Sequence, residues 1–361
     1  MALRPLRPSW VAVGLLAMVT LLLAGCSGAA MTPSSWPGVS ADSTTAYIAN
    51  NQAVYAVDLA TGAERWRFPA QPDRAIALFA TPTLTDDGLV ILGGFNRVVY
   101  ALKASDGSVA WQFAKAKDRY IGGAAVAGEL VLVPCADHTL YALQRASGAL
   151  VWSFKTKAPL WAAPLVEGET VYLPAQDHNL YALEARTGKL IWSQDLGGAL
   201  SDTPVLTGGS LLAGTFGQGL AAVDARAGKP VWTVPTDGWV WGNPATDAVA
   251  AYFGDLAGTA RAVSLKDGST LWTFQPGAPV VASPALGDGV VYFVSSGGLI
   301  QARATSDGAS KWEVTLAGPT ETDPLLTGDV LLVAVSSSPD VLLAALDPAT
   351  GAARWTFAPA K

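Results

Sequence analysis

The chain of 361 residues contains little charge, two cysteines and two histidines. Charged side chains make up 14% of it, with 23 basic residues against 29 acidic ones. An acidic balance provides no general field to hold a phosphate backbone, so we do not expect a nucleic acid as partner. Two cysteines cannot form a disulfide framework, and the cysteines and histidines do not have zinc-finger spacing. These absences exclude disulfide-rich and zinc-finger proteins.

The first 25 residues have the pattern of a secretory signal. Arg4 and Arg7 precede a largely apolar run, residues 10–24, and small residues lead to Cys26. At about 1.5 Å per residue, this run is shorter than a hydrocarbon core of about 30 Å. We therefore expect residues 1–25 to be a removed signal peptide rather than a transmembrane helix.

The sequence Leu23-Ala24-Gly25-Cys26 resembles the lipobox of bacterial lipoproteins. The resemblance implies that Cys26 is lipidated, and an ordinary secretory peptide that happens to contain a cysteine is the alternative. Residues 26–35 then form the lipidated end and a flexible tether. Ser27 stands where an aspartate would mark inner-membrane retention. We expect an extracytoplasmic, lipid-anchored protein, held in the outer membrane if the source has two membranes.

An internal repeat occupies the rest of the chain. Residues 56–66 and 345–355 share the form Ala-x-Asp-x-x-Thr-Gly-x-x-x-Trp, and six degenerate copies lie between them at a period of 40 to 45 residues. Such a period is typical of propeller blades and solenoids. The repeated pairs are Gly62 and Trp66, Gly107 and Trp111, Gly148 and Trp152, Gly188 and Trp192, Gly228 and Trp232, Gly268 and Trp272, Gly308 and Trp312, and Gly351 and Trp355.

The interior of each period predicts four short strands. Runs rich in β-branched and aromatic residues, such as 140–143, 170–173 and 290–294, lie between turn signals, and no helical pattern is present. A proline opens most units, which suits the start of a strand. The sequence thus predicts an all-β protein in which residues 36–361 form a single eight-bladed β-propeller of four-stranded antiparallel blades.

Each repeated residue type has a structural reason. The glycine suits a turn with positive φ, and the tryptophan can fill the wedge between neighbouring blades. Asp58, Asp224 and Asp347 are short acceptors for turn amides. Cys135, on a β-rich segment, is expected to be a small core residue without chemistry. We therefore assign the motif to the scaffold rather than to a ligand site.

The motif resembles the tryptophan-docking (PQQ-like) repeat of quinoprotein dehydrogenases, which also builds the BamB family of outer-membrane barrel-assembly lipoproteins. The BamB-like resemblance implies a noncatalytic scaffold that binds protein partners, with a barrel-assembly role where an outer membrane exists. A PQQ-dependent dehydrogenase would use pyrroloquinoline quinone, a metal held by oxygen ligands, a carboxylate base and often two adjacent cysteines. This chain has no adjacent cysteines and nearly minimal blades. We expect no cofactor, and keep a PQQ-dependent dehydrogenase or quinone-binding protein as the alternative.

One face of such a propeller carries the loops between blades together with the loops between second and third strands. A basic and aromatic sector is predicted on this face, in an otherwise acidic molecule, as the site for a protein partner. Its residues are Arg74, Phe79, Lys115, Lys117, Arg119, Tyr120, Lys155, Lys157 and Trp161.

Other side chains on the same face have more than one possible role. His138 and His178 occupy equivalent places in adjacent blades, and we interpret them as turn residues of a duplicated hairpin rather than as a metal site. Trp161 and Trp241 could contact a partner or plug the mouth of the central channel, and both readings stay open. Later loops bring an acidic group with interspersed tryptophan: Asp195, Asp202, Asp237, Trp239, Glu321 and Asp323.

Overall fold

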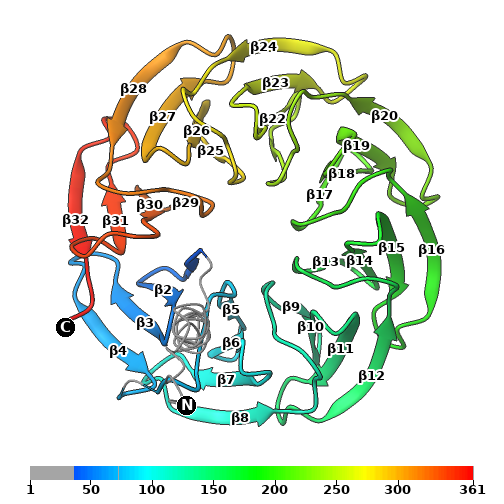
Figure 1. Cartoon of the computed structure of the whole chain (residues 1–361), viewed down its shortest axis with the longest axis vertical. Coiled ribbons are helices and arrows are strands. Elements are labelled where there is room, and N and C mark those ends of the chain that lie inside the picture. The colour runs from blue at the N-terminus through cyan, green and yellow to red at the C-terminus, as the bar shows by residue number, and fades with distance from the viewer. Residues whose placement is uncertain (1–35, 72, 361) are drawn as a thin grey trace, which may run out of the picture. The chain divides into compact units, whose positions relative to one another are not determined.

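The computed structural model describes residues 36–71 and 73–360, and all the secondary-structure elements assigned in these residues are β-strands. The strands form eight sheets of four, each built from consecutive strands. Figure 1 shows the sheets arranged as blades around a ring, with the first strand of each blade nearest the centre. This confirms the predicted all-β, eight-bladed propeller. In the described part of the chain, no helix is long and apolar enough to cross a membrane.

The first four blades contain sixteen strands. Blade 1 is β1 (Gly38–Ala41), β2 (Thr45–Asn50), β3 (Ala53–Asp58) and β4 (Glu64–Phe68), and blade 2 is β5 (Thr83–Leu84), β6 (Leu89–Gly93), β7 (Val99–Lys103) and β8 (Val109–Phe113). Blade 3 is β9 (Ala125–Ala127), β10 (Leu130–Pro134), β11 (Thr139–Gln144) and β12 (Leu150–Lys155), and blade 4 is β13 (Leu165–Glu167), β14 (Thr170–Pro174), β15 (Asn179–Glu184) and β16 (Leu190–Asp195).

The remaining blades repeat this plan. Blade 5 is β17 (Val205–Thr207), β18 (Ser210–Thr215), β19 (Gly219–Asp224) and β20 (Pro230–Val234), and blade 6 is β21 (Ala245–Thr246), β22 (Ala250–Gly254), β23 (Ala260–Ser264) and β24 (Thr270–Phe274). Blade 7 is β25 (Ala285–Gly287), β26 (Val290–Val294), β27 (Leu299–Ala304) and β28 (Ser310–Thr315), and blade 8 is β29 (Leu325–Thr327), β30 (Val330–Ala334), β31 (Leu343–Leu346) and β32 (Ala353–Phe357).

The repeated tryptophan joins each blade to the next. Its indole N–H donates to a backbone carbonyl of the following blade in all eight copies, at 2.7–3.2 Å. Its ring covers the repeated glycine of that blade, which has φ between 69° and 75°. A Cβ at these glycines would lie only 2.5–3.0 Å from a ring atom of the tryptophan or, at Gly268, equally close to a valine. The positions therefore require glycine for both backbone conformation and space.

The hydrophobic core is divided among the eight interfaces between blades. The cluster between blades 3 and 4, for example, contains Leu132, Leu140, Leu173 and Leu183, all fully buried. The second and third strands supply most of these residues because they pack against neighbouring blades on both sides. The blades are thus held together mainly by apolar packing, and each interface carries one tryptophan hydrogen bond.

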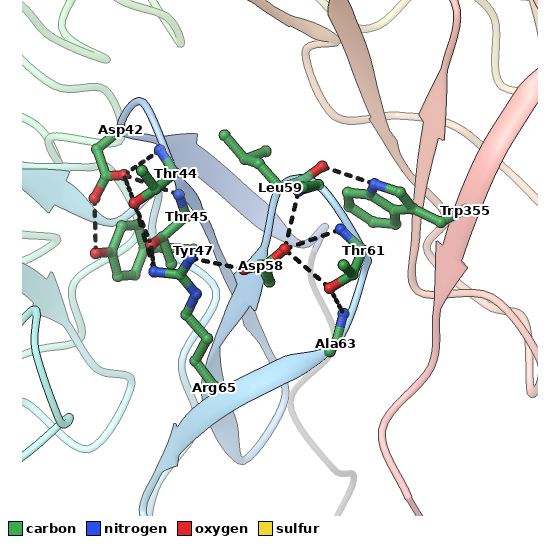
Figure 2. Close-up of polar contacts among 11 residues, drawn as sticks. Asp42, Thr44, Thr45, Tyr47, Asp58, Leu59, Thr61, Ala63, Arg65 and Trp355 are labelled. Carbon is green, nitrogen blue, oxygen red and sulfur yellow. Dashed lines mark hydrogen bonds and ion pairs between the residues drawn. The ribbon is translucent and has the colours of Figure 1, made fainter.

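The ring closes without exchange of strands between its ends. Blade 1 contains only the first four strands and blade 8 only the last four. Figure 2 shows the closure, where Trp355 donates to the carbonyl of Leu59 at 2.8 Å. The Asp58 carboxylate holds the adjacent turn by accepting the N–H groups of Ala60 and Thr61 at 3.0 and 2.9 Å. The two ends of the propeller are therefore joined by noncovalent contacts alone.

Candidate partner-binding face

The candidate partner-binding residues lie on one face of the ring. Because strands alternate in direction within a blade, the loops between blades emerge on the same side as the loops between second and third strands. We call this side the interblade face. Its loops between blades are residues 69–82, 114–124, 156–164, 196–204, 235–244, 275–284 and 316–324.

Basic side chains gather on the interblade face between blades 1 and 4. We define the basic sector by seven of them, all exposed, and none makes an ion pair with another described residue. Six of them lie on loops, which contain two acidic residues, Asp73 and Asp118, and Lys155 ends β12, so a net positive charge remains. The members are Arg74, Arg97, Lys115, Lys117, Arg119, Lys155 and Lys157.

The aromatic residues of this sector differ from the sequence prediction. Phe79 and Tyr120 do not lie on the surface, being 6% and 0% exposed. Phe79 instead supports Phe95, with ring centroids 5.2 Å apart, and the Arg119 guanidinium lies 5.4 Å from the Phe95 centroid. Phe95 and Arg97 belong to the loop between β6 and β7, and sequence analysis missed them. Inspecting the hairpin loops as well as the loops between blades would have found both.

Two equivalent aspartates hold the basic loops in place. The Asp137 carboxylate accepts the backbone N–H of Lys117 at 2.9 Å and the hydroxyl of Tyr141 at 2.7 Å. Asp177 does the same, at the same two distances, for Lys157 and its own tyrosine. Burial disfavours the charged form of Asp137, but these hydrogen bonds outweigh it, and the pKa of Asp137 lies below its usual value. The lysines are thus displayed on loops with a fixed backbone.

The histidines and the free cysteine have structural positions. His138 and His178 lie at the same turn position with φ of 71° and 72°. No group of three or more potential metal ligands occurs among the described residues. The Cys135 thiol is fully buried, and this burial raises its pKa to about 12, so the reactive thiolate is not populated at neutral pH.

Carboxylates lie near the ring centre on the same face. Asp202, just before β17, accepts the Asn243 N–H at 2.9 Å and the Ser283 hydroxyl at 2.6 Å. The Ser283 N–H in turn donates to Asp323 at 2.7 Å. Desolvation by the surrounding protein, together with the nearby charge of Asp202, raises the pKa of Asp323.

This centre does not fit pyrroloquinoline quinone. The quinone carries carboxylate groups, and the loops that lead into blades 5 to 8 contain no lysine or arginine to bind them. The only cysteines of the chain, Cys26 and Cys135, are far apart in sequence. The residues present therefore do not make a quinone site of the kind expected for a dehydrogenase.

Trp161 and Trp241 occupy equivalent positions in the repeat, each four residues before the first strand of its blade. Trp36 contacts Trp241 edge-on, with centroids 5.1 Å apart, which favours a plugging role for Trp241. Trp161 is half-buried and has no aromatic partner among the described residues. Its role as a partner contact stays a prediction.

Comparisons with known proteins agree with this geometry. The sequence model of the family described as outer membrane protein assembly factor BamB matches residues 27–120, 96–238, 177–281 and 256–361. A crystal structure of BamB from Moraxella catarrhalis has a TM-score of 0.70 at 19% identity, covering 82% of this chain and 93% of that one. No curated protein matches the sequence.

Two further solved structures share the fold. The computationally designed Ika8 protein has a TM-score of 0.66 at 14% identity, covering 78% of this chain and 87% of that one. Quinohemoprotein alcohol dehydrogenase from Comamonas testosteroni has a TM-score of 0.64 at 15% identity, covering 76% of this chain and 66% of that one. At these identities the likeness concerns the fold alone, since one propeller fold hosts unrelated functions.

Proposed function

The chain belongs to the family of the outer membrane protein assembly factor BamB, and from this premise we propose that it is a noncatalytic extracytoplasmic scaffold that binds a protein partner through the basic sector. Where the source has an outer membrane, the partner is a component of the barrel-assembly machinery. The basic sector carries this proposal. Its exposed cations have no ion-pair partner among the described residues, and their loops are held by Asp137 and Asp177.

The chemistry of the sector favours an acidic, extended segment as the bound element. Complementary charge accelerates encounter, whereas packed side chains slow dissociation. Arg119 stacked on Phe95 offers both a charge and an apolar surface, and Trp161 is a second half-buried aromatic. Because the loop backbone is already ordered by hydrogen bonds, little conformational entropy is lost when a partner binds.

Lipidation of Cys26 would hold this face close to a membrane. Cys26 lies outside the described residues, and Trp36, the first described residue, contacts Trp241 on the interblade face. The intervening chain can span at most about 35 Å. A lipid on Cys26 would thus place the interblade face within reach of the membrane surface and of proteins embedded there. Cys26→Ser should release the protein from membranes, and membrane retention of a processed Cys26→Ser protein would contradict the anchor.

The partner site can be tested with three linked measurements on the full chain. Crosslinking in native membranes first identifies the bound protein, with a barrel-assembly component as the first candidate. Replacement of Lys115, Lys117 and Arg119 by Glu should then slow association and reverse its salt dependence. Trp161→Ala should speed dissociation and cost about 2 kcal/mol of binding free energy.

A matched control lies on the opposite face. Arg186→Glu with Lys189→Glu reverses charge beside the Gly188 turn and should leave binding unchanged. If the partner binds the triple variant and Trp161→Ala as tightly as the wild type but loses affinity for this control, the wrong face has been chosen. The noncatalytic assignment has its own test, since stoichiometric, tight binding of pyrroloquinoline quinone with calcium would contradict it.

A further inference from the structure

A second group of aromatic side chains lies on the interblade face, between blades 5 and 6. Phe216 belongs to the loop between β18 and β19, and Trp239 and Trp241 belong to the loop between β20 and β21. The rings of Phe216 and Trp239 are stacked, with centroids 4.9 Å apart and planes 12° apart, and Trp241 lies 4.8 Å from Phe216. We call these three residues the aromatic platform.

Trp239 is the exposed member of the platform. Its side chain is 52% exposed, and it is the one aromatic among the exposed large apolar side chains of the described residues. Phe216 covers one face of the indole ring, so the exposure is to the other side. A large aromatic held with its face toward solvent is a common anchor of protein interfaces.

The backbone around the platform is held rigidly. The carbonyl of Trp239 accepts the N–H of Leu256 from blade 6 at 3.0 Å, and the N–H of Val240 donates to Thr215 in blade 5 at 3.3 Å. Gly238 packs so closely that a Cβ there would lie 2.2 Å from the backbone nitrogen of Ala257. The platform is therefore preorganised between two blades, and its exposed ring does not need to be ordered when a ligand binds.

The charge around the platform is of one sign. The loops of the interblade face between residues 196 and 342 contain no lysine, arginine or histidine. They carry six acidic residues, and Asp195 at the end of β16 is a seventh. Only Asp255 among these forms an ion pair within the described residues, with Arg261 at 2.6 Å. Asp237 is exposed and lies two residues before Trp239. The negative field and the electron-rich face of the indole both attract a cation.

From this arrangement we propose that the aromatic platform is a second docking site, which binds an arginine-bearing extended segment of a partner protein. A guanidinium group can stack on the free face of Trp239 while its N–H groups pair with the Asp237 carboxylate. Lysine provides only a compact charge and fits the flat ring less well. Anionic lipids and nucleic acids are disfavoured because the surrounding acidic residues repel phosphate.

This site is independent of the basic sector, since it rests on other residues and on the opposite charge. The two together make the interblade face bipolar: blades 1 to 4 attract acidic segments, and blades 5 to 8 attract basic ones. A partner with both kinds of segment would be held in one orientation across the ring.

The experiment is a titration of the full chain in detergent with a fluorescein-labelled peptide, Gly-Arg-Gly-Arg-Gly-Arg-Gly, followed by fluorescence anisotropy. Saturable binding is expected at peptide concentrations below about 1 mM. Trp239→Ala should weaken it by about tenfold, and Asp237→Asn by a smaller factor. The exposure of both side chains makes loss of folding unexpected, and the thermal unfolding temperature of each variant checks this. If Trp239→Ala does not fold, Asp237→Lys takes its place and should abolish binding.

Four controls test whether the binding is specific to arginine and to the aromatic platform. The matching peptide with lysine should bind more weakly and the one with glutamate should not bind. Trp161→Ala, on the other half of the same face, should leave peptide affinity unchanged. The Lys115, Lys117 and Arg119 triple variant should bind the arginine peptide like wild type, so failure of the basic sector and failure of this site are distinguishable. Absence of saturation, equal binding by Trp239→Ala, or equal affinity for the lysine peptide would overturn the proposal.

Discussion

Removal of Trp355 tests how the ring is closed. Trp355→Ala deletes the indole that covers Gly62 and the hydrogen bond to the Leu59 carbonyl. A buried tryptophan replaced by alanine costs about 3 to 5 kcal/mol, and the half-buried state of Trp355 places its cost near the lower end, about 3 kcal/mol. About 1 kcal/mol of this belongs to the hydrogen bond. Trp355→Phe, which keeps an aromatic ring, should therefore lose less than Trp355→Ala.

Urea unfolding followed by circular dichroism measures these losses, and hydrogen exchange locates them. Trp192→Ala is the matched control, because Trp192 makes the equivalent hydrogen bond to Ala225 at 3.2 Å between blades that the chain also connects covalently. Both alanine variants should lose similar unfolding free energy. Only Trp355→Ala should increase exchange in β1–β4 and β29–β32 below the global unfolding transition, because no chain segment joins those blades directly. A loss below about 1 kcal/mol for Trp355→Ala, or equal local exchange in both variants, would refute this explanation of closure.

Three further predictions concern single positions. Gly188→Ala should cost about 2 to 4 kcal/mol of unfolding free energy, because φ is 71° and the new Cβ would lie 2.5 Å from the Trp152 ring. Gly168 has a φ of 55° and open space around it, so Gly168→Ala should cost about 1 kcal/mol in the same urea titration. Because the pKa of Asp323 is raised in the folded protein, the folded state holds more protons than the unfolded chain, and wild-type stability falls as pH rises. Asp323→Asn removes this titration, so its unfolding temperature relative to wild type should rise by an amount that grows from pH 5 to pH 9. A constant difference in unfolding temperature would contradict this. The Cys135 thiol should react with a thiol reagent in the native state only as fast as the protein unfolds, and rapid native labelling at pH 8 would show that the thiol is accessible.

On the interblade face, the sequence predicted the positions of the exposed lysines but not the burial of the aromatic residues. The exposed lysines could be located because loop position along the chain determines which face a residue occupies. The burial of Phe79 and Tyr120 could not be predicted from the sequence. An aromatic residue at a given position in a loop between blades can point either toward solvent or into the next blade. Packing of the adjacent loop decides between these orientations, and in this protein the half-buried Phe95 lies beside Arg119.

The carboxylates at the ring centre depend even more on tertiary structure. Asp202 and Ser283 are separated by 81 positions, and no local pattern predicts the hydrogen bond between them. It forms because the inner ends of blades 5 and 7 approach each other near the centre of the ring. The stacking of Phe216 on Trp239 also depends on tertiary structure, since the two residues belong to different loops that the fold brings together.

The sequence by itself determined the class of fold, the number of blades and the presence of four strands in each blade. A repeat of short strands cannot bury its apolar faces alone, so eight copies must stack, and the glycine and tryptophan pair marks every interface. How the ring closes was decided only by the tertiary structure. Closure by exchanged strands and closure by docking of complete blades use the same repeated residues, and the docking of Trp355 onto Gly62 makes the first and last blades an interface like the other seven.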